Sequence, residues 1–300
     1  MSPLERFSGL AQRYLKGAQV SALRDAYLAS RTRLAPVLKW VHGSFDAPAL
    51  RAHLESRVGN RFDVLMVHSS VNHMLPMYTG TPLDLLRMLL DWCGPSRTLA
   101  MPAFWFGDAA LGGAYETLRR RPRFDLRRTP SQMGLVTELF RRLPGALASR
   151  HPVYRVVALG PLAAALTAGH EHADVPAGRG TPFEFMAAHD TLILGVGKPM
   201  QVMTQAHHVE GLLGEAFPVP CRVGDPLPIT LVDGKSEFAH TVWRRGYEGR
   251  FNMWRLRKVM SRAELMEWHF HHVPLFASRA DLVTRRLVQA AQRGFTLYEP

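Results

Sequence analysis

The stretch Asp63-Val-Leu-Met-Val-His-Ser-Ser70 decides the fold, because a short apolar run here ends abruptly in polar groups. Such a run is typical of a buried strand. In open α/β sheets, ligands collect where strands end. His68, Ser69 and Ser70 are therefore candidate binding residues, since hydroxyls and bare amides suit a polar chain. The alternative is a loop in which Ser69 only caps the next turn.

Helical and extended patterns alternate on both sides of this strand. A helix is expected from Asp46 to Arg57, and another from Thr81 to Trp92, with Thr81 as N-cap and Pro82 at the first helical position. Further helices are expected over 135–142, 161–168, 183–188 and 280–293, and further strands over 98–101, 156–159 and 191–194. This alternation predicts an α/β sandwich.

Both ends of the chain depart from this alternation. After Gly224, alternating apolar residues run into the Asp233-Gly234 turn, which predicts a hairpin. His269-Phe-His-His272 could recruit a metal, but we interpret it as an exposed helix end. Residues 1–43 are expected to form a basic helical extension, and residues 44–300 one large domain. The extension would pack on its own domain, on a second subunit in a homodimer, or on anionic lipid as an interfacial helix.

The composition is that of a soluble globular protein, with 47% hydrophobic and 21% charged residues among 300. No stretch of about 18 uncharged apolar residues exists, so no transmembrane span is expected. Charged residues near the N-terminus leave no signal peptide, which favours a cytoplasmic protein. The two cysteines lack the spacing of a zinc ribbon or a redox motif.

The net charge of +12 comes mostly from arginine. Arginine favours phosphates and carboxylates, so an anionic ligand, a nucleic acid or an acidic membrane are all admissible partners. A simple solvated surface explains the charge equally well. A non-catalytic basic protein therefore stays open as one hypothesis, although we expect no nucleic-acid role.

The segment Thr204-Gln-Ala-His-His-Val-Glu210 has the spacing of a catalytic helix face. On a helix, Thr204, His207 and Glu210 face one side. A carboxylate beside an imidazole raises its basicity and fixes its tautomer, as general-base catalysis requires. A metal site is the weaker reading, because the adjacent His208 points elsewhere and His-Glu-x-x-His spacing is absent. A polar helix face without catalytic function remains the other alternative.

Familiar catalytic motifs are missing. The chain has no Gly-x-Ser-x-Gly elbow, no Walker loop and no dinucleotide fingerprint after a strand. Arg150-His151-Pro152 precedes the strand at 156–159, but one histidine before a proline does not by itself indicate a function.

Eight separated segments, in this order, resemble the aminoglycoside 3-N-acetyltransferase family from about Asp46 to Phe217. They are Val67-His-Ser-Ser70, Met101-Pro-Ala-Phe104, Thr129-Pro-Ser-Gln-Met-Gly134, Ser149-Arg-His-Pro152, Ala158-Leu-Gly-Pro161, Pro176-x-Gly-x-Gly-Thr-Pro-Phe183, Leu192-x-Leu-Gly-Val-Gly197 and Thr204-x-x-His207-x-x-Glu210. Each segment alone is a weak signal, whereas eight in register are a strong one.

The resemblance implies a three-layer α/β/α sandwich with a central mixed sheet, here with an N-terminal helical extension. It implies acetyl-CoA as donor, direct transfer to an amine, and no metal. His207 would be the catalytic base and Glu210 its supporting carboxylate. The residues expected to bind acetyl-CoA or to lie beside its channel are His68, Ser69, Ser70, Ser131, Met133, Gly134 and His151.

The chemistry agrees with these roles. A protonated amine is not a nucleophile, so a base must remove a proton before or during attack on the thioester. We also expect Thr204 to donate to the thioester carbonyl as negative charge develops there.

Departures from the family pattern shape the expected substrate. Ala103 stands where members often carry threonine, and Arg155 where serine is usual. The region from Arg222 to Arg262 is mostly basic, which suits a polycationic drug poorly. We therefore expect an N-acetyltransferase for a small-molecule or carrier-linked aminosugar in surface-polysaccharide biosynthesis. The second hypothesis is an aminoglycoside 3-N-acetyltransferase that confers antibiotic resistance.

Overall fold

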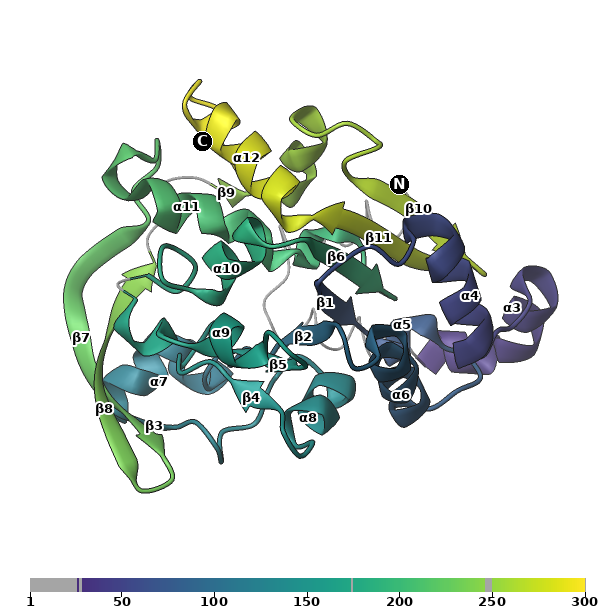
Figure 1. The fold of residues 1–300 in the computed structure, drawn as a ribbon, viewed down its shortest axis with the longest axis horizontal. Coiled ribbons are helices and arrows are strands. Elements are labelled where there is room, and N and C mark those ends of the chain that lie inside the picture. The colour runs from purple at the N-terminus through teal and green to yellow at the C-terminus, as the bar shows by residue number, and fades with distance from the viewer. Residues whose placement is uncertain (1–25, 27–28, 174, 246–249, 300) are drawn as a thin grey trace.

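A seven-stranded mixed sheet runs through the centre of the molecule (Figure 1). The computed structural model describes residues 26, 29–173, 175–245 and 250–299. The strand order is β10 (Met266–Phe270), β11 (Val273–Arg279), β6 (Thr191–Val196), β1 (Val64–Ser69), β2 (Thr98–Pro102), β5 (Val156–Leu159) and β4 (Leu147–Ala148). Strands β6, β1 and β2 are parallel, whereas β11, β5, β10 and β4 add antiparallel pairs. The predicted central mixed sheet is confirmed.

Strand β1 is buried on both faces, as its sequence predicts. Val64 and Met66 belong to one apolar cluster, and Leu65 and Val67 belong to another on the opposite face. The alternation of side chains along a strand explains this division. The strand also runs farther than the apolar stretch, since His68 and Ser69 still pair with β6.

Helices cover both faces of the sheet (Figure 1). One face carries α4 (Ala47–Val58), α5 (Val71–Met74), α6 (Pro82–Cys93) and α8 (Leu135–Arg141). The other face carries α9 (Ala163–Thr167), α10 (Pro182–Ala188), α11 (His208–Leu213) and α12 (Ala280–Ala291). Each set packs on its own apolar cluster, so the predicted three-layer sandwich is present.

The helix starts follow from local chemistry. Thr81 accepts from the backbone amide of Asp84, and the Asp84 carboxylate accepts from the amide of Thr81, which is a capping box for α6. Asp46 caps α4 by accepting from the amide of Ala49 at 2.9 Å. These caps begin both helices where the sequence predicts them.

A third, smaller apolar cluster lies at one side of the sandwich. The long hairpin of β7 (Arg222–Asp233) and β8 (Ser236–Arg245) packs there with β3 (Arg123–Asp125) and α7 (Ala114–Arg120) (Figure 1). The hairpin turns at Asp233-Gly234, as predicted. Gly234 has φ of 66°, a conformation that glycine adopts without strain.

Shorter elements complete the described chain. They are α3 (Ala35–His42), η1 (Ala109–Leu111), η2 (His170–His172), η3 (Met200–Val202), η4 (Thr204–His207), η5 (Gly214–Ala216), η6 (Met253–Lys258), β9 (Arg250–Phe251) and β12 (Tyr298–Glu299). Strands β9 and β12 pair antiparallel and form a two-stranded ribbon.

The histidine-rich stretch is not a helix end. His269 belongs to β10, and His271 and His272 form the turn between β10 and β11 with positive φ angles of 46° and 62°. The expected helix is wrong. Side-chain exposure along β10 alternates from one residue to the next, which is the pattern of a strand and not of a helix. Among the described residues, no group of three or more His, Cys, Asp or Glu is arranged to hold a metal ion.

Most of the expected N-terminal extension lies outside the described residues. Its described part includes α3, on which Trp40 is 85% exposed beside Val37 and Val41. No helix in the described ranges combines the length and apolarity required to cross a membrane.

One charged side chain is wholly buried in the sandwich. Arg155 is 0% exposed and donates to the carbonyl oxygens of Ala103, Leu126 and Thr129 at 3.3, 2.6 and 3.0 Å. Burial lowers the pKa of Arg155 to about 10, so it stays charged at neutral pH. Arg155 therefore ties the chain around 126–129 to the sheet.

Replacing Arg155 by leucine should destabilise the fold. The variant leaves three carbonyl oxygens without their buried donor, which we expect to lower the free energy of unfolding by about 3 kcal/mol. Urea unfolding of the variant and the wild type measures the difference. Arg119→Leu is the matched control, because that side chain is 61% exposed and should change stability by less than about 1 kcal/mol. Equal losses for the two variants would contradict the role of Arg155.

Candidate active site

His207 and Glu210 form a hydrogen-bonded pair at the junction of η4 and α11. The Nδ1 atom of His207 lies 2.7 Å from Oε1 of Glu210, three residues along the chain. The segment is not one continuous α-helix as expected, because a 3₁₀ turn ends at His207 before α11 begins. Side chains three apart still meet in this geometry.

The carboxylate determines which imidazole nitrogen can act as a base. The Glu210 carboxylate accepts a hydrogen bond from Nδ1 of His207, so the neutral imidazole carries its proton on Nδ1 and its lone pair on Nε2. The side chains of His207 and Glu210 are only 18% and 7% exposed. A largely buried carboxylate beside an imidazole is the arrangement that general-base chemistry requires.

Three aromatic residues distant in sequence surround this pair. The Phe251 ring stacks on His207 at 4.7 Å between centroids, and the Tyr154 ring lies 6.1 Å from the imidazole. The hydroxyl of Tyr298 donates to Oε1 of Glu210 at 2.7 Å. Sequence reasoning missed all three, because β9, β12 and the loop before β5 meet only through the fold.

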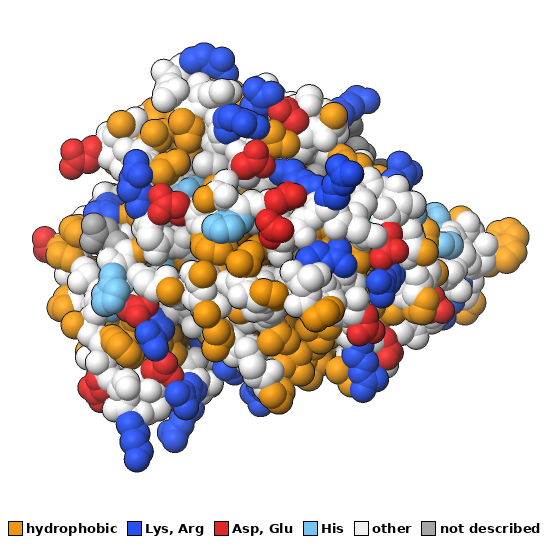
Figure 2. Space-filling model, in the orientation of Figure 1, with side chains coloured by type: hydrophobic (Ala, Val, Ile, Leu, Met, Phe, Trp, Pro, Cys, Tyr) orange, Lys and Arg blue, Asp and Glu red, His pale blue; other side chains and the backbone are white. Residues whose placement is uncertain are grey.

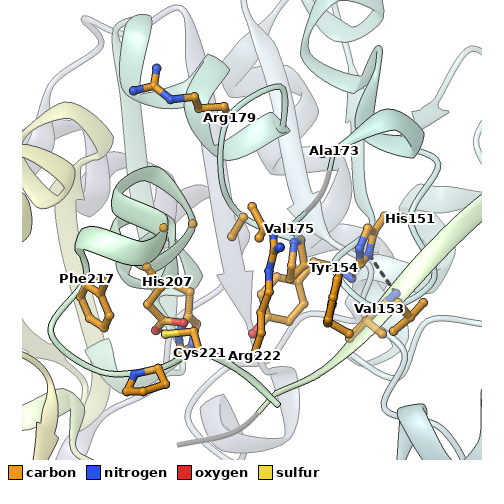
Figure 3. A pocket seen from close by; sticks show the side chains of 18 of the residues that line it. His151, Val153, Tyr154, Ala173, Val175, Arg179, His207, Phe217, Cys221 and Arg222 are labelled. Atoms are coloured by element: carbon orange, nitrogen blue, oxygen red, sulfur yellow. Dashed lines mark hydrogen bonds and ion pairs between the residues drawn. The ribbon is translucent and has the colours of Figure 1, made fainter. Parts of the chain in front are cut away.

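A pocket of about 770 Å³ opens beside the pair (Figure 3). This volume is within the range of small-molecule sites. His207, Glu210 and His151 line it, so three of the predicted site residues share one cavity. Apolar side chains make up much of the remaining wall, among them Val153, Tyr154, Val175, Phe217, Cys221 and Trp243.

The charged residues of this pocket have both signs. Glu210 and Glu215 supply carboxylates, and Arg179 and Arg222 supply guanidinium groups. The guanidinium carbon of Arg222 also lies 5.2 Å from the centre of the Trp243 ring, which holds this end of the side chain against the wall. The pocket can therefore bind an anionic group and a cationic group at different points of its wall.

His151 is held rigidly at the pocket wall. Its Nδ1 accepts from the backbone amides of Val153 and Tyr154 at 3.1 and 2.9 Å, so the neutral ring carries its proton on Nε2. It stacks on His170 at 4.6 Å and lies edge-to-face with His240. Burial, followed by the two neighbouring histidines, lowers the pKa of His151 far below its usual value.

His68 lies inside the sheet rather than at the pocket wall. Neither of its nitrogens has a hydrogen-bond partner among the described residues, and its ring lies 6.2 Å from that of Phe276. Burial, and secondarily Lys198, lowers the pKa of His68 to about 3. Ser69 and Ser70 follow at the end of β1, where both backbones meet Val196 of β6.

The remaining predicted residues lie outside the pocket wall. Ser131 accepts from the amide of Met133 at 3.1 Å, in the loop that leads to Gly134 before α8. The Thr204 hydroxyl is buried and has no hydrogen-bond partner within the described ranges. Its expected role as a hydrogen-bond donor to the thioester carbonyl stays a prediction. The geometry thus groups His207, Glu210 and His151, and leaves the acetyl-CoA roles of the others as predictions.

Comparison with known proteins gives consistent results. A family model described as Aminoglycoside 3-N-acetyltransferase matches residues 66–292. Aminoglycoside N(3)-acetyltransferase IX of Micromonospora chalcea is 33% identical over 159 residues, covering 50% of this chain and 56% of the relative. Aminoglycoside N(3)-acetyltransferase III of Serratia marcescens is 33% identical over 181 residues, covering 58% and 66%. The chain therefore spans between about half and two thirds of the length of these relatives.

Solved structures confirm the fold. Aminoglycoside acetyltransferase AAC(3)-Xa matches with a TM-score of 0.69 at 23% identity, covering 88% of this chain and 99% of that one. AAC-IIIb in its binary complex with CoASH matches with a TM-score of 0.66 at 22% identity, covering 85% and 99%. The three-layer sandwich predicted from the resemblance is the fold of both.

These relatives overturn the expected role in surface-polysaccharide biosynthesis. The family model and the relatives named above are aminoglycoside acetyltransferases. The expectation rested on the basic region from Arg222 to Arg262, which was assumed to face the acceptor. Among the described charged residues of that region, only Arg222 lines the pocket, so its net charge says little about the site.

The depressed pKa of His68 predicts acid sensitivity. Its folded pKa of about 3 lies below the unfolded value of 6.5, so the unfolded chain takes up a proton first as the pH falls. His68 alone should then lower the free energy of unfolding by up to about 1.4 kcal/mol per pH unit below about pH 6.5. His68→Leu removes this contribution, so urea unfolding between about pH 7 and 5 should show a shallower slope.

His172→Leu is the control for this measurement, because its side chain is 80% exposed. The control should keep the slope of the wild type. A slope unchanged in His68→Leu would show that burial of this imidazole does not affect acid stability.

Proposed function

Since this chain belongs to the aminoglycoside 3-N-acetyltransferase family, we propose that it transfers an acetyl group from acetyl-CoA to the 3-amino group of an aminoglycoside. The observation that carries the proposal is the 2.7 Å hydrogen bond between His207 and Glu210 at the wall of the pocket. We assign the activity to residues 44–300, and residues 1–43 would form an extension to that domain.

The proposed chemistry uses one base and no covalent enzyme intermediate. Nε2 of His207 accepts a proton from the acceptor amine, whose nitrogen attacks the thioester carbonyl carbon. The carbon–sulfur bond then breaks, the amide forms, and the leaving thiolate takes the proton from Nε2 of His207, which returns the imidazole to its neutral form. Glu210 stabilises the imidazolium that exists in between and holds the ring in the required tautomer.

The two signs of charge in the pocket suit the two proposed substrates. An aminoglycoside is a polycation, and Glu215 offers a carboxylate to its ammonium groups, while the charge of Glu210 adds to the negative potential there. CoA carries phosphates, and Arg179 and Arg222 offer guanidinium groups to them. A pocket of a single sign would repel one of the two reactants.

The other predicted residues have proposed roles toward acetyl-CoA. A thioester carbonyl gains negative charge during attack, and the buried Thr204 hydroxyl would donate to it. The channel for the pantetheine arm would be lined by Ser69, Ser70, Ser131, Met133 and Gly134, with His68 and His151 beside it. The structure of AAC-IIIb, a protein of the same fold, contains CoASH. Acetyl-CoA is accordingly the donor that we propose here.

Removing the base should abolish most of the activity. We expect His207→Ala to lower kcat by about a hundredfold or more, which is the usual contribution of a general base. Acetyl-CoA affinity, measured by calorimetry, should stay close to that of the wild type because the imidazole acts on the amine. His172→Ala controls for the loss of a histidine elsewhere. Near-normal turnover of His207→Ala would show that another group is the base.

Expression in a sensitive bacterial host tests the substrate. The wild type should raise the inhibitory concentrations of aminoglycosides that carry a 3-amino group, and the His207→Ala variant should not. Mass spectrometry of the drug should show one added acetyl group per molecule. No protection, together with no acetylation of several such drugs by the purified protein, would overturn the proposed substrate.

A further inference from the structure

We propose that Tyr298, in the C-terminal strand β12, is a positioning residue that acts on the base through Glu210. It would hold the carboxylate in place and moderate how strongly that carboxylate attracts the proton of His207. The proposal rests on the proposed function, in which His207 is the base. It concerns a part of the chain beyond the residues 66–292 that match the family model.

Two described side chains share one carboxylate oxygen. Oε1 of Glu210 lies 2.7 Å from the Tyr298 hydroxyl and 2.7 Å from Nδ1 of His207. Tyr298 is 4% exposed and Glu210 is 7% exposed, so water screens this arrangement little. The Tyr298 hydroxyl and the His207 imidazole therefore both draw on the negative charge of the same Glu210 oxygen.

The C-terminal segment is fastened where this contact requires it. The amide of Asn252 donates to the carbonyl of Leu297 at 2.7 Å, and Nε of Arg255 donates to the carbonyl of Thr296 at 2.7 Å. Thr296 also accepts from the amide of Tyr298 at 3.2 Å. These bonds fix the backbone on both sides of Leu297, so the Tyr298 side chain has little freedom to move.

The same ribbon holds the other half of the pair. Tyr298 is paired with Phe251 across β12 and β9, and their rings lie 5.2 Å apart. Phe251 stacks on His207, with 29° between the ring planes. A single two-stranded ribbon therefore contacts the imidazole with one residue and the carboxylate with its partner.

The hydroxyl has a predictable electrostatic effect. A hydrogen bond to a carboxylate stabilises its charge and weakens its attraction for a neighbouring imidazolium. Without the hydroxyl, Glu210 would hold the protonated form of His207 more strongly, and His207 would lose its proton at a higher pH. The Glu210 carboxylate would also lose one of the hydrogen bonds that hold it in place.

Other charged and titratable groups near the pair could also influence this titration. Among the residues that the structure describes, those that line the pocket or flank the pair are His151, Tyr154, Arg179, His208, Glu215, Cys221, Arg222 and Arg250. None of these is altered by a change at Tyr298, so a single substitution isolates the contribution of its hydroxyl.

The variant Tyr298→Phe removes the hydroxyl and keeps the ring. We expect kcat to fall about threefold to tenfold, the factor that corresponds to the net strength of one hydrogen bond. The acidic limb of the pH profile of kcat/KM should move to higher pH by about half a unit to one unit. Tyr115→Phe is the matched control, because the Tyr115 hydroxyl makes a 3.4 Å contact with the Asp225 carbonyl and neither residue lines the pocket.

A purely structural role for Tyr298 would leave the titration of His207 unchanged. NMR titration of the His207 imidazole in the full chain therefore tests the proposal without relying on turnover. We expect the midpoint to rise in Tyr298→Phe and to equal the wild type in Tyr115→Phe. An unchanged midpoint in Tyr298→Phe would overturn the proposal.

The two measurements also separate this proposal from the proposed function. A wild-type protein that acetylates no aminoglycoside would overturn the substrate assignment, while a raised midpoint in Tyr298→Phe would still support the coupling through Glu210. Normal acetylation by the wild type with an unchanged midpoint would overturn the coupling alone.

Discussion

The close packing of β6 against its two neighbours in the sheet, β1 and β11, is the constraint on which the site depends. A Cβ on Gly195 would collide with the ring of Phe276, and a Cβ on Gly197 would lie 2.5 Å from the carbonyl oxygen of Ser70. Gly197 also has φ of 68°, which other residues adopt only with strain. Because these positions lack side chains, β6 packs closely against β11 at Gly195 and against the end of β1 at Gly197, and the chain then continues through η3 to the segment that carries His207.

The pair of His207 and Glu210 forms locally, but its position in the pocket depends on residues distant in the sequence. His207 and Glu210 are three residues apart, so their contact forms within one turn of chain. A pair formed so locally fixes its own spacing but not its position relative to a substrate. Tyr154 and the ribbon of β9 and β12 supply that position, since they enclose the pair from elements far apart in the sequence. The site is thus a local motif held by remote packing.

The sequence predicts what is periodic or local and misses what is not. The buried strand at 64–67, the cap at Thr81 and the turn at Asp233-Gly234 all follow from neighbouring residues, and all are present. The pairing of His207 with Glu210 follows from their spacing. Tyr298 could not be found in this way, because its partner lies 88 residues away and a tyrosine near a chain end carries no signal of its own.

The net charge of the chain led to a wrong prediction of the biological role for a related reason. A net charge of +12 is a sum over the whole chain, whereas binding depends on the potential at one cavity. Many arginines are occupied in surface ion pairs such as Arg123 with Glu237, and Arg155 serves the backbone inside the core. Of the charged side chains in the described part of the chain, two guanidinium and two carboxylate groups line the pocket itself. A site that joins a cationic acceptor to an anionic donor requires both signs, so local balance there is compatible with a strongly basic chain.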